Sequence, residues 1–130
     1  MGPYFTVEEA NQVLPDLEVL ALEAMAVYKR IKALHPQIKG VLNKSPAGSG
    51  SRAASQMTMA FIRLEEIENK MKDLGAKLKE PDIGVCDILA LHEGRDVYLC
   101  WQYGEERIEW WHELHTGFQA RRHVSELIQS

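Results

Sequence analysis

Two long runs of apolar residues, spaced in alternating steps of four and three, constrain the fold of this chain most. The first run comprises Val13, Leu17, Leu20, Ala24, Val27, Ile31, Leu34, Ile38 and Val41. The second comprises Ala53, Met57, Ala60, Leu64, Ile67, Met71, Leu74 and Leu78. This spacing places apolar side chains along one side of a helix, as in a coiled coil. Glycine, serine and proline dominate residues 45–51 between the runs, so residues 1–79 are predicted to form an antiparallel helical hairpin with a flexible tip.

The predicted hairpin also contains start, stop and break signals. Thr6 and Glu9 have the spacing of a capping box, which predicts the helix start. Pro15 lacks an amide hydrogen and its ring clashes with the carbonyl four residues earlier, so we expect a short first helix and then a break or kink. Pro36 predicts a bend, and Gly75 predicts the end of the second helix.

The composition changes after residue 80, where β-branched and aromatic residues alternate with short turn sequences. Strands are predicted at residues 85–91, 96–103 and 108–114, joined by turns that contain glycine. They form a three-stranded antiparallel meander, and residues 124–130 are either a short helix or a frayed tail. We therefore predict one α+β domain over residues 1–130, with the hairpin in 1–79 and the β unit and tail in 80–130.

The bulk properties bear on the cellular compartment. The longest apolar runs fall well short of the roughly 18 residues that a membrane span requires. The first ten residues lack the basic and apolar regions of a secretory signal. Cys86 and Cys100 do not form a disulfide framework, and reduced, buried thiols are the favoured interpretation. We expect a cytoplasmic protein without a membrane partner.

Three stretches of the sequence resemble a known family. They are Tyr4-Phe-Thr-Val-Glu-Glu-Ala-Asn11 with Leu14-Pro15, then Asp82-Ile-Gly84 with Val85 and Asp87, and finally Gly94-Arg-Asp-Val-Tyr-Leu-Cys-Trp101 and Trp111-His-Glu-Leu114 with Gly117-Phe118. Together they are similar to the uncharacterised bacterial family called domain of unknown function 2203, over essentially the whole chain. The resemblance implies no established activity and no catalytic residues. Family sequences usually have an acid where this chain has His115.

Candidate metal ligands cluster in the last predicted strand. His112, Glu113 and His115 are residue types that bind divalent transition metals, but the helical HExxH spacing is absent. In a strand, His112 faces opposite to Glu113 and His115, so a site there has to recruit an acid such as Asp87 from a neighbouring strand. The favoured alternative is that His112 or Glu113 makes a hydrogen bond or an ion pair, for example with Arg95, that fixes the sheet.

Three tryptophans lie within eleven residues: Trp101, Trp110 and Trp111. Trp110 and Trp111 point to opposite faces of their predicted strand. Cross-strand packing is the favoured interpretation. A subunit interface and stacking on a planar ligand are the alternatives.

The charge is distributed unevenly along the chain, which has a net charge of −4. Residues 29–52 contain six cations and no acid, and Lys39, Lys44 and Arg52 are the candidate anion-binding residues of the hairpin tip. A solvated helix face is favoured over contact with nucleic acid, because the segment has no interleaved aromatic residues and no recognised motif.

These observations give a ranked set of functions. The first is a homodimeric interaction or scaffold module. The two apolar runs, called seams below, can pack against each other, but other apolar side chains of the hairpin would still need cover. The second, from another class, is a metal- or small-ligand-binding protein, with enzymatic activity as one form of it, that uses Asp87, Arg95, His112, Glu113 and His115. Contact between the basic tip and an anionic polymer ranks third. The sequence contains no GxSxG, P-loop or GxGxxG motif, so it favours a non-enzymatic role. No cofactor is expected from the sequence, and a divalent transition metal is the one alternative to that expectation.

Overall fold

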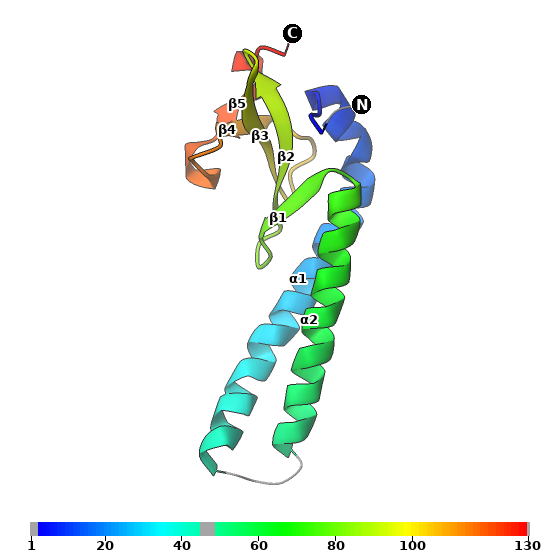
Figure 1. The fold of residues 1–130 in the computed structure, drawn as a ribbon, viewed down its shortest axis with the longest axis vertical. Coiled ribbons are helices and arrows are strands. Elements are labelled where there is room, and N and C mark those ends of the chain that lie inside the picture. Colours follow the sequence, from blue (N-terminus) through cyan, green and yellow to red (C-terminus); the bar gives the residue numbers. More distant parts are fainter. Residues whose placement is uncertain (1–2, 45–48, 130) are drawn as a thin grey trace.

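The computed structural model describes the backbone of residues 3–44 and 49–129, and the side chains of these residues outside 39–51. Helices α1 (Val7–Lys44) and α2 (Ser49–Asp73) lie side by side as an antiparallel hairpin (Figure 1). Five strands follow in chain order: β1 (Ala76–Glu80), β2 (Val85–His92), β3 (Arg95–Gln102), β4 (Trp110–Glu113) and β5 (Arg122–His123). The predicted α+β class and the helical hairpin are confirmed.

The predicted seam residues form the contact between the two helices, but α1 also buries residues that the seam did not include. In α2 the seam residues Ala53, Ala60, Leu64, Ile67 and Met71 are buried. In α1, Leu17, Ala24, Ile31 and Leu34 are buried as expected, but so are Ala10, Leu14 and Ala21. The buried positions keep the four-three spacing, and Leu20 and Val27 of the predicted run stay half-buried against the core. The buried stripe of α1 is therefore wider than predicted near the sheet. Val41 lies outside the described side chains.

The start of α1 confirms one local prediction and corrects another. The Glu9 amide donates to the Thr6 hydroxyl at 3.1 Å, and the Thr6 amide donates to the Glu9 carboxylate at 2.9 Å, which is the predicted capping box. The separate short helix is wrong, because α1 runs without interruption through Pro15 and Pro36. Burial of α1 residues on both sides of Pro15 offsets the hydrogen bond that the proline loses.

α2 ends before the last residue of the second seam, and Gly75 is the reason. Gly75 has a φ of +92°, which ends the helix and turns the chain. A Cβ atom at this position would lie 2.3 Å from the Phe5 ring, so any other residue would require that ring to move. The predicted helix end at Gly75 is confirmed, whereas the assignment of Leu78 to the helical run is wrong, because this residue lies in β1.

The sheet is antiparallel throughout, in the order β1-β2-β3-β4-β5. The three predicted strands correspond to β2, β3 and β4, and two strands were missed. β1 has the short alternating sequence AKLKE, whose Leu78 also fits the apolar spacing of the preceding helix, and β5 has two residues, which is too few for a strand pattern. The tail is held in place: the Ile128 amide donates to Nδ1 of His92, and the Gln129 side chain bonds the backbone of Phe5 and Val7.

The two faces of the sheet have different surroundings. One face packs on the helices and contributes Cys86, Ile88, Val97, Leu99, Trp101 and Trp111 to the hydrophobic core. Because side chains alternate along a strand, Asp87, Cys100 and His112 point to the opposite face. Neither described helix has a stretch that is both long and apolar enough to cross a membrane.

Candidate metal centre

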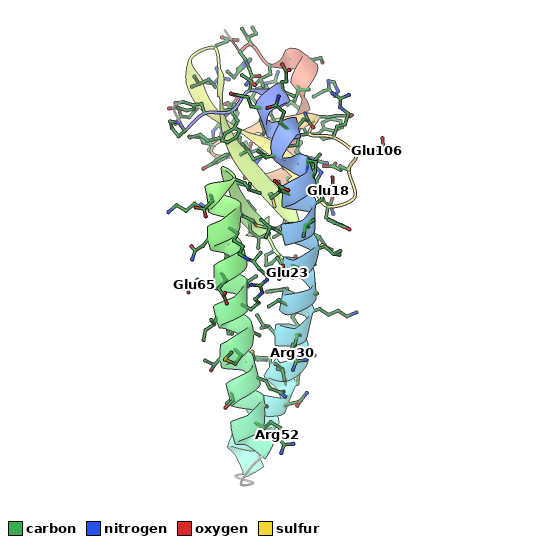
Figure 2. The ribbon with its side chains drawn as sticks, turned by 90° about the vertical axis from the view of Figure 1, so that its right-hand side faces the viewer. Glu18, Glu23, Arg30, Arg52, Glu65 and Glu106 are labelled. Atoms are coloured by element: carbon green, nitrogen blue, oxygen red, sulfur yellow. The ribbon has the colours of Figure 1, made fainter. Side chains whose placement is uncertain are left out.

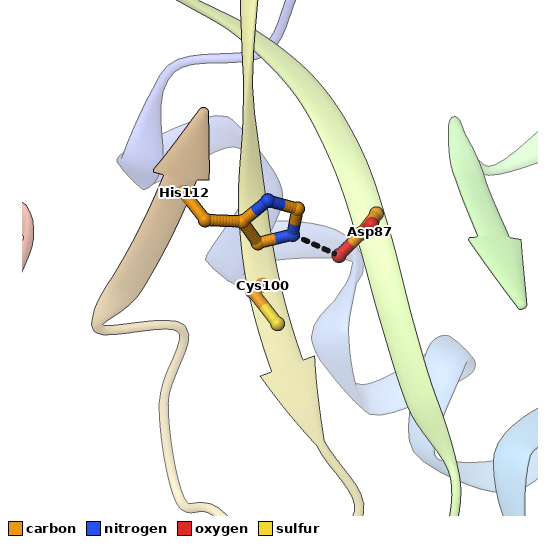
Figure 3. Close-up of side chains that lie close together, drawn as sticks. All are labelled: Asp87, Cys100 and His112. Atoms are coloured by element: carbon orange, nitrogen blue, oxygen red, sulfur yellow. Dashed lines mark hydrogen bonds and ion pairs between the residues drawn. The ribbon is translucent and has the colours of Figure 1, made fainter. Parts of the chain in front are cut away.

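Three potential metal ligands come together on the sheet face that points away from the helices. Asp87 lies in β2 and pairs with Cys100 in β3, while His112 in β4 pairs with Tyr98, two residues before Cys100. A carboxylate oxygen, the thiol sulfur and a ring nitrogen all lie within 4.8 Å of one another. Figure 3 shows the three side chains converging over the middle strand. The antiparallel register of β2, β3 and β4 thus builds the cluster.

The hydrogen bonds of His112 define what its ring can do. Nδ1 lies 2.8 Å from the Glu113 carbonyl oxygen, which can only accept, so Nδ1 carries a proton and donates. Nε2 lies 3.0 Å from Oδ1 of Asp87 (Figure 3). In the neutral ring, the lone pair of Nε2 would face the oxygen of an ionised carboxylate, which is repulsive. The arrangement therefore calls for a cation between the two residues: either a proton that makes the ring an imidazolium, or a metal ion.

The titration behaviour agrees with this arrangement. Burial lowers the pKa of His112, but the hydrogen bonds to Asp87 and the Glu113 carbonyl, with the charge of Asp87, outweigh it and raise the pKa above its ordinary value of 6.5. Burial, and then the charge of Asp87, raise the pKa of the Cys100 thiol to about 12. Without a metal, Cys100 is therefore a neutral thiol and His112 holds its second proton more tightly than a free histidine.

The cluster is enclosed but not sealed. Asp87 and His112 are each 2% exposed and Cys100 is fully buried. A cavity of about 150 Å³ reaches Asp87 and His112, and its wall is formed by β1, β2, β3 and the segment after β4. The other lining residues are Lys79, Glu80, Val85, Tyr98, Leu114, Thr116, Gly117 and Phe118. A small molecule in this cavity would therefore reach the carboxylate and the imidazole.

These donor atoms suit zinc or a similar ion. Carboxylate, thiolate and imidazole are all established zinc ligands, with bond lengths of about 2.0–2.3 Å. Ligand atoms around a tetrahedral ion with such bonds lie about 3.3–3.8 Å apart. The pair at 3.0 Å would open slightly, and separations near the 4.8 Å limit would close by about 1 Å. Three protein ligands would leave one position for water or another small ligand.

The same residues do not form a nucleophilic relay. A cysteine nucleophile needs a ring nitrogen that accepts its proton. Nδ1 of His112 is bonded to a carbonyl and Nε2 to a carboxylate, so neither is directed to the thiol. The raised pKa of Cys100 opposes thiolate formation as well.

The structure separates the other predicted ligands from this cluster. Arg95, at the start of β3, and Glu113, at the end of β4, form an ion pair at 2.7 Å. This is the type of contact that the sequence favoured over a metal site. His115 lies beyond the end of β4 and is exposed. Cys100 was not among the predicted ligands. Its place in the cluster follows from the strand pairing: Asp87 and Cys100 are directly opposite each other in β2 and β3, so their side chains lie on the same face of the sheet.

The aromatic and basic candidates also occupy distinct places. Trp101 and Trp111 are buried in the core, where their ring nitrogens donate to the carbonyls of Glu105 and His123. Trp110 is half-buried, with its ring edge-on to His123 and beneath the guanidinium of Arg121. Arg52 is exposed in α2. The side chains of Lys39 and Lys44 lie outside the described residues.

The molecule is thus an α+β protein in which a helical hairpin adjoins a five-stranded antiparallel sheet with a buried Asp-Cys-His cluster. The family model described as "Uncharacterized conserved protein (DUF2203)" matches residues 3–124, so the chain belongs to this family. The match confirms the resemblance noted in the sequence and includes all three residues of the cluster. Searches of curated proteins and of solved structures gave no match.

Proposed function

We propose that this protein binds a divalent transition metal ion, zinc foremost, through Asp87, Cys100 and His112. The orientation of His112 carries the proposal. Its Nδ1 donates to a backbone carbonyl while Nε2 lies 3.0 Å from the Asp87 carboxylate, with the Cys100 thiol close to both residues. Metal-ligating histidines have this arrangement, because a bond from the other nitrogen fixes the ring and its tautomer.

The metal function now ranks above the homodimeric module that the sequence placed first. Asp87 and His112 pair across β3, and the buried thiol of Cys100 completes a set of three donors of types that zinc prefers. The simpler alternative is that the Asp87–His112 ion pair only links β2 to β4. That alternative explains the 3.0 Å contact, but it assigns no role to the cavity beside the pair.

Metal binding would change the protonation of two residues. The ion would displace the proton between Asp87 and His112, and it would remove the proton of Cys100, whose pKa is about 12 without metal. Binding should therefore release protons and should weaken as the pH falls. The fourth position would face the cavity, where a water or a small anion has room.

Cobalt substitution tests the proposal directly. Chelator-treated protein is titrated with Co²⁺, and the expected result is one ion per chain with a thiolate-to-cobalt charge-transfer band in the near ultraviolet. Zinc should then displace the cobalt and abolish the band. Saturation without a thiolate band would contradict the proposed ligand set, and no binding at all would contradict the function.

Cys86 provides a matched control. It precedes Asp87 in β2, is fully buried on the helix-facing side, and has a pKa that burial raises to about 12. Cys100→Ala should abolish the charge-transfer band, whereas Cys86→Ala should keep it. Loss of the band in both variants would indicate damage to the fold, so the far-ultraviolet circular dichroism spectrum of each variant is recorded alongside.

A further inference from the structure

Acidic and basic residues are distributed unevenly along the hairpin, away from the proposed metal centre. Residues 7–23 of α1 contain five acids and no lysine or arginine, whereas residues 24–62 contain six cations and no acid. The acidic part of the hairpin adjoins the sheet, and the basic part leads to the tip. Figure 2 shows Glu18, Glu23 and Glu65 in the upper part of the hairpin, and Arg30 and Arg52 in the lower part.

One side of α2 concentrates this asymmetry in a line of residues at intervals of seven. The line comprises Arg52, Met59, Glu66 and Asp73, and residues seven apart lie on the same side of a helix. The sign of charge changes across Met59, which is 64% exposed. Arg52 and Glu66 lie about 10.5 Å on either side of it along the helix axis.

The neighbouring surface of α1 repeats the pattern. Asp16, Glu23 and Arg30 are also spaced by seven, with the change from acid to base at the same level of the hairpin. Glu23 makes an ion pair with Arg63 of α2 at this level. Between the helices, Val27, Arg30, Met59 and Arg63 line a groove of about 360 Å³. Arg63 also lies 3.7 Å from Glu66 of its own helix. The apolar centre of this side is therefore small, formed by Val27 and Met59, and the line of residues along α2 runs from Arg52 at one end to Glu66 and Asp73 at the other.

We propose that this side of the hairpin binds a second copy of the same chain in antiparallel orientation. A two-fold axis through Met59 would place the Met59 side chains of the two protomers together. It would also place Arg52 of each protomer opposite Glu66 of the other. An interface of this kind uses the same patch twice, so the patch must be complementary to itself after a half-turn. A charge pattern that is antisymmetric about an apolar centre meets this requirement.

The size of the surface agrees with a dimer. α2 has 25 residues, so it is about 37 Å long. Two packed helices present a width of roughly 18–20 Å, which gives about 700 Å² per protomer. Stable interfaces bury about 800 Å² per partner. The two hairpins would together form a four-helix bundle with a sheet at each end.

A charge-reversal cycle tests the proposed register. Sedimentation equilibrium of wild-type protein at about 0.1 M salt should show a dimer at micromolar concentration. Arg52→Glu and Glu66→Arg should each raise the dissociation constant about tenfold or more, because each brings like charges together twice. The double variant should recover most of the wild-type affinity. Glu65→Arg, on a different side of α2, is the matched control and should change little.

Cross-linking tests the two-fold axis independently. Met59→Cys should form an intermolecular disulfide rapidly with oxidised glutathione, whereas Phe61→Cys should not. Phe61 is 53% exposed and follows Met59 by two residues, so it has similar access on the other side of the helix. Faster cross-linking at Phe61, or a dimer that is indifferent to both charge reversals, would overturn the proposed face. A monomer at 100 μM, with or without binding of duplex RNA to the basic half, would overturn the dimer itself.

Discussion

The hairpin and the outer face of the sheet maintain their structure in different ways. The hairpin core consists of many small or medium apolar side chains, each of which contributes modestly to the contact between α1 and α2. The sheet face has one buried polar pair, Asp87 and His112, beside a thiol. Dispersed apolar contacts are tolerant of change, whereas a buried pair is costly to break. A buried polar pair of this kind, outside the main core, is consistent with the metal role proposed above.

The largest expected effect comes from breaking the buried pair. Asp87→Ala leaves the buried imidazole without its partner, so the ring must either remain charged and unpaired or lose its second proton, and the free energy of unfolding of metal-free protein should fall by about 3–5 kcal/mol. Chemical denaturation measures the loss. The double variant Asp87→Val, His112→Leu should lose less than the single one, because apolar replacement of both partners removes the unpaired charge. A loss well below 1 kcal/mol in Asp87→Ala would show that the pair is not a buried ion pair.

The hairpin core should show a somewhat smaller and more graded response. Ile67 is fully buried, and Ile67→Ala should cost about 2–4 kcal/mol through lost burial and a cavity, while Ile67→Val should cost about 1 kcal/mol. Denaturation of both variants compares the two costs. Equal losses would contradict a core in which stability scales with the volume removed.

Gly75 connects the two regions, and its replacement should have an intermediate effect. Gly75→Ala should cost about 1–2 kcal/mol for a side chain at positive φ, with an additional penalty from the Phe5 ring. Gly94→Ala is the control, because Gly94 also has positive φ but a Cβ there meets no atom within 4 Å. Thermal unfolding should therefore show a lower midpoint for Gly75→Ala than for Gly94→Ala, and the reverse order would contradict the close contact with Phe5.

The pH dependence of stability should give the smallest effect. The pKa of His112 is higher in the folded protein than its ordinary value of 6.5, so folded protein binds the proton more tightly. The resulting stabilisation is complete below pH 6.5 and is lost as the pH rises through the folded pKa. Denaturation of metal-free protein across this range should show a decline that His112→Leu lacks. A decline of the same size in both would assign it to other residues.

The hairpin was predictable from the sequence to a greater extent than the site. The apolar spacing specifies two antiparallel helices with local information, although α2 begins at Ser49, inside the tip that was predicted over residues 45–51, and residues 45–48 lie outside the described backbone. Continuity through Pro15 depended on burial at both sides of it, which is a tertiary property. The site depended on register: Asp87, Cys100 and His112 meet only because β2, β3 and β4 align as they do, and a slip of one residue would reverse the face of each side chain.

X-ray absorption spectroscopy of protein loaded with one equivalent of zinc tests the central proposal most directly. The account predicts one sulfur ligand at about 2.3 Å and two or three nitrogen or oxygen ligands at about 2.0–2.1 Å. Cys100→Ala should lose the sulfur shell and Cys86→Ala should retain it. A spectrum with only nitrogen and oxygen ligands in the wild-type protein would contradict a metal centre built from Asp87, Cys100 and His112.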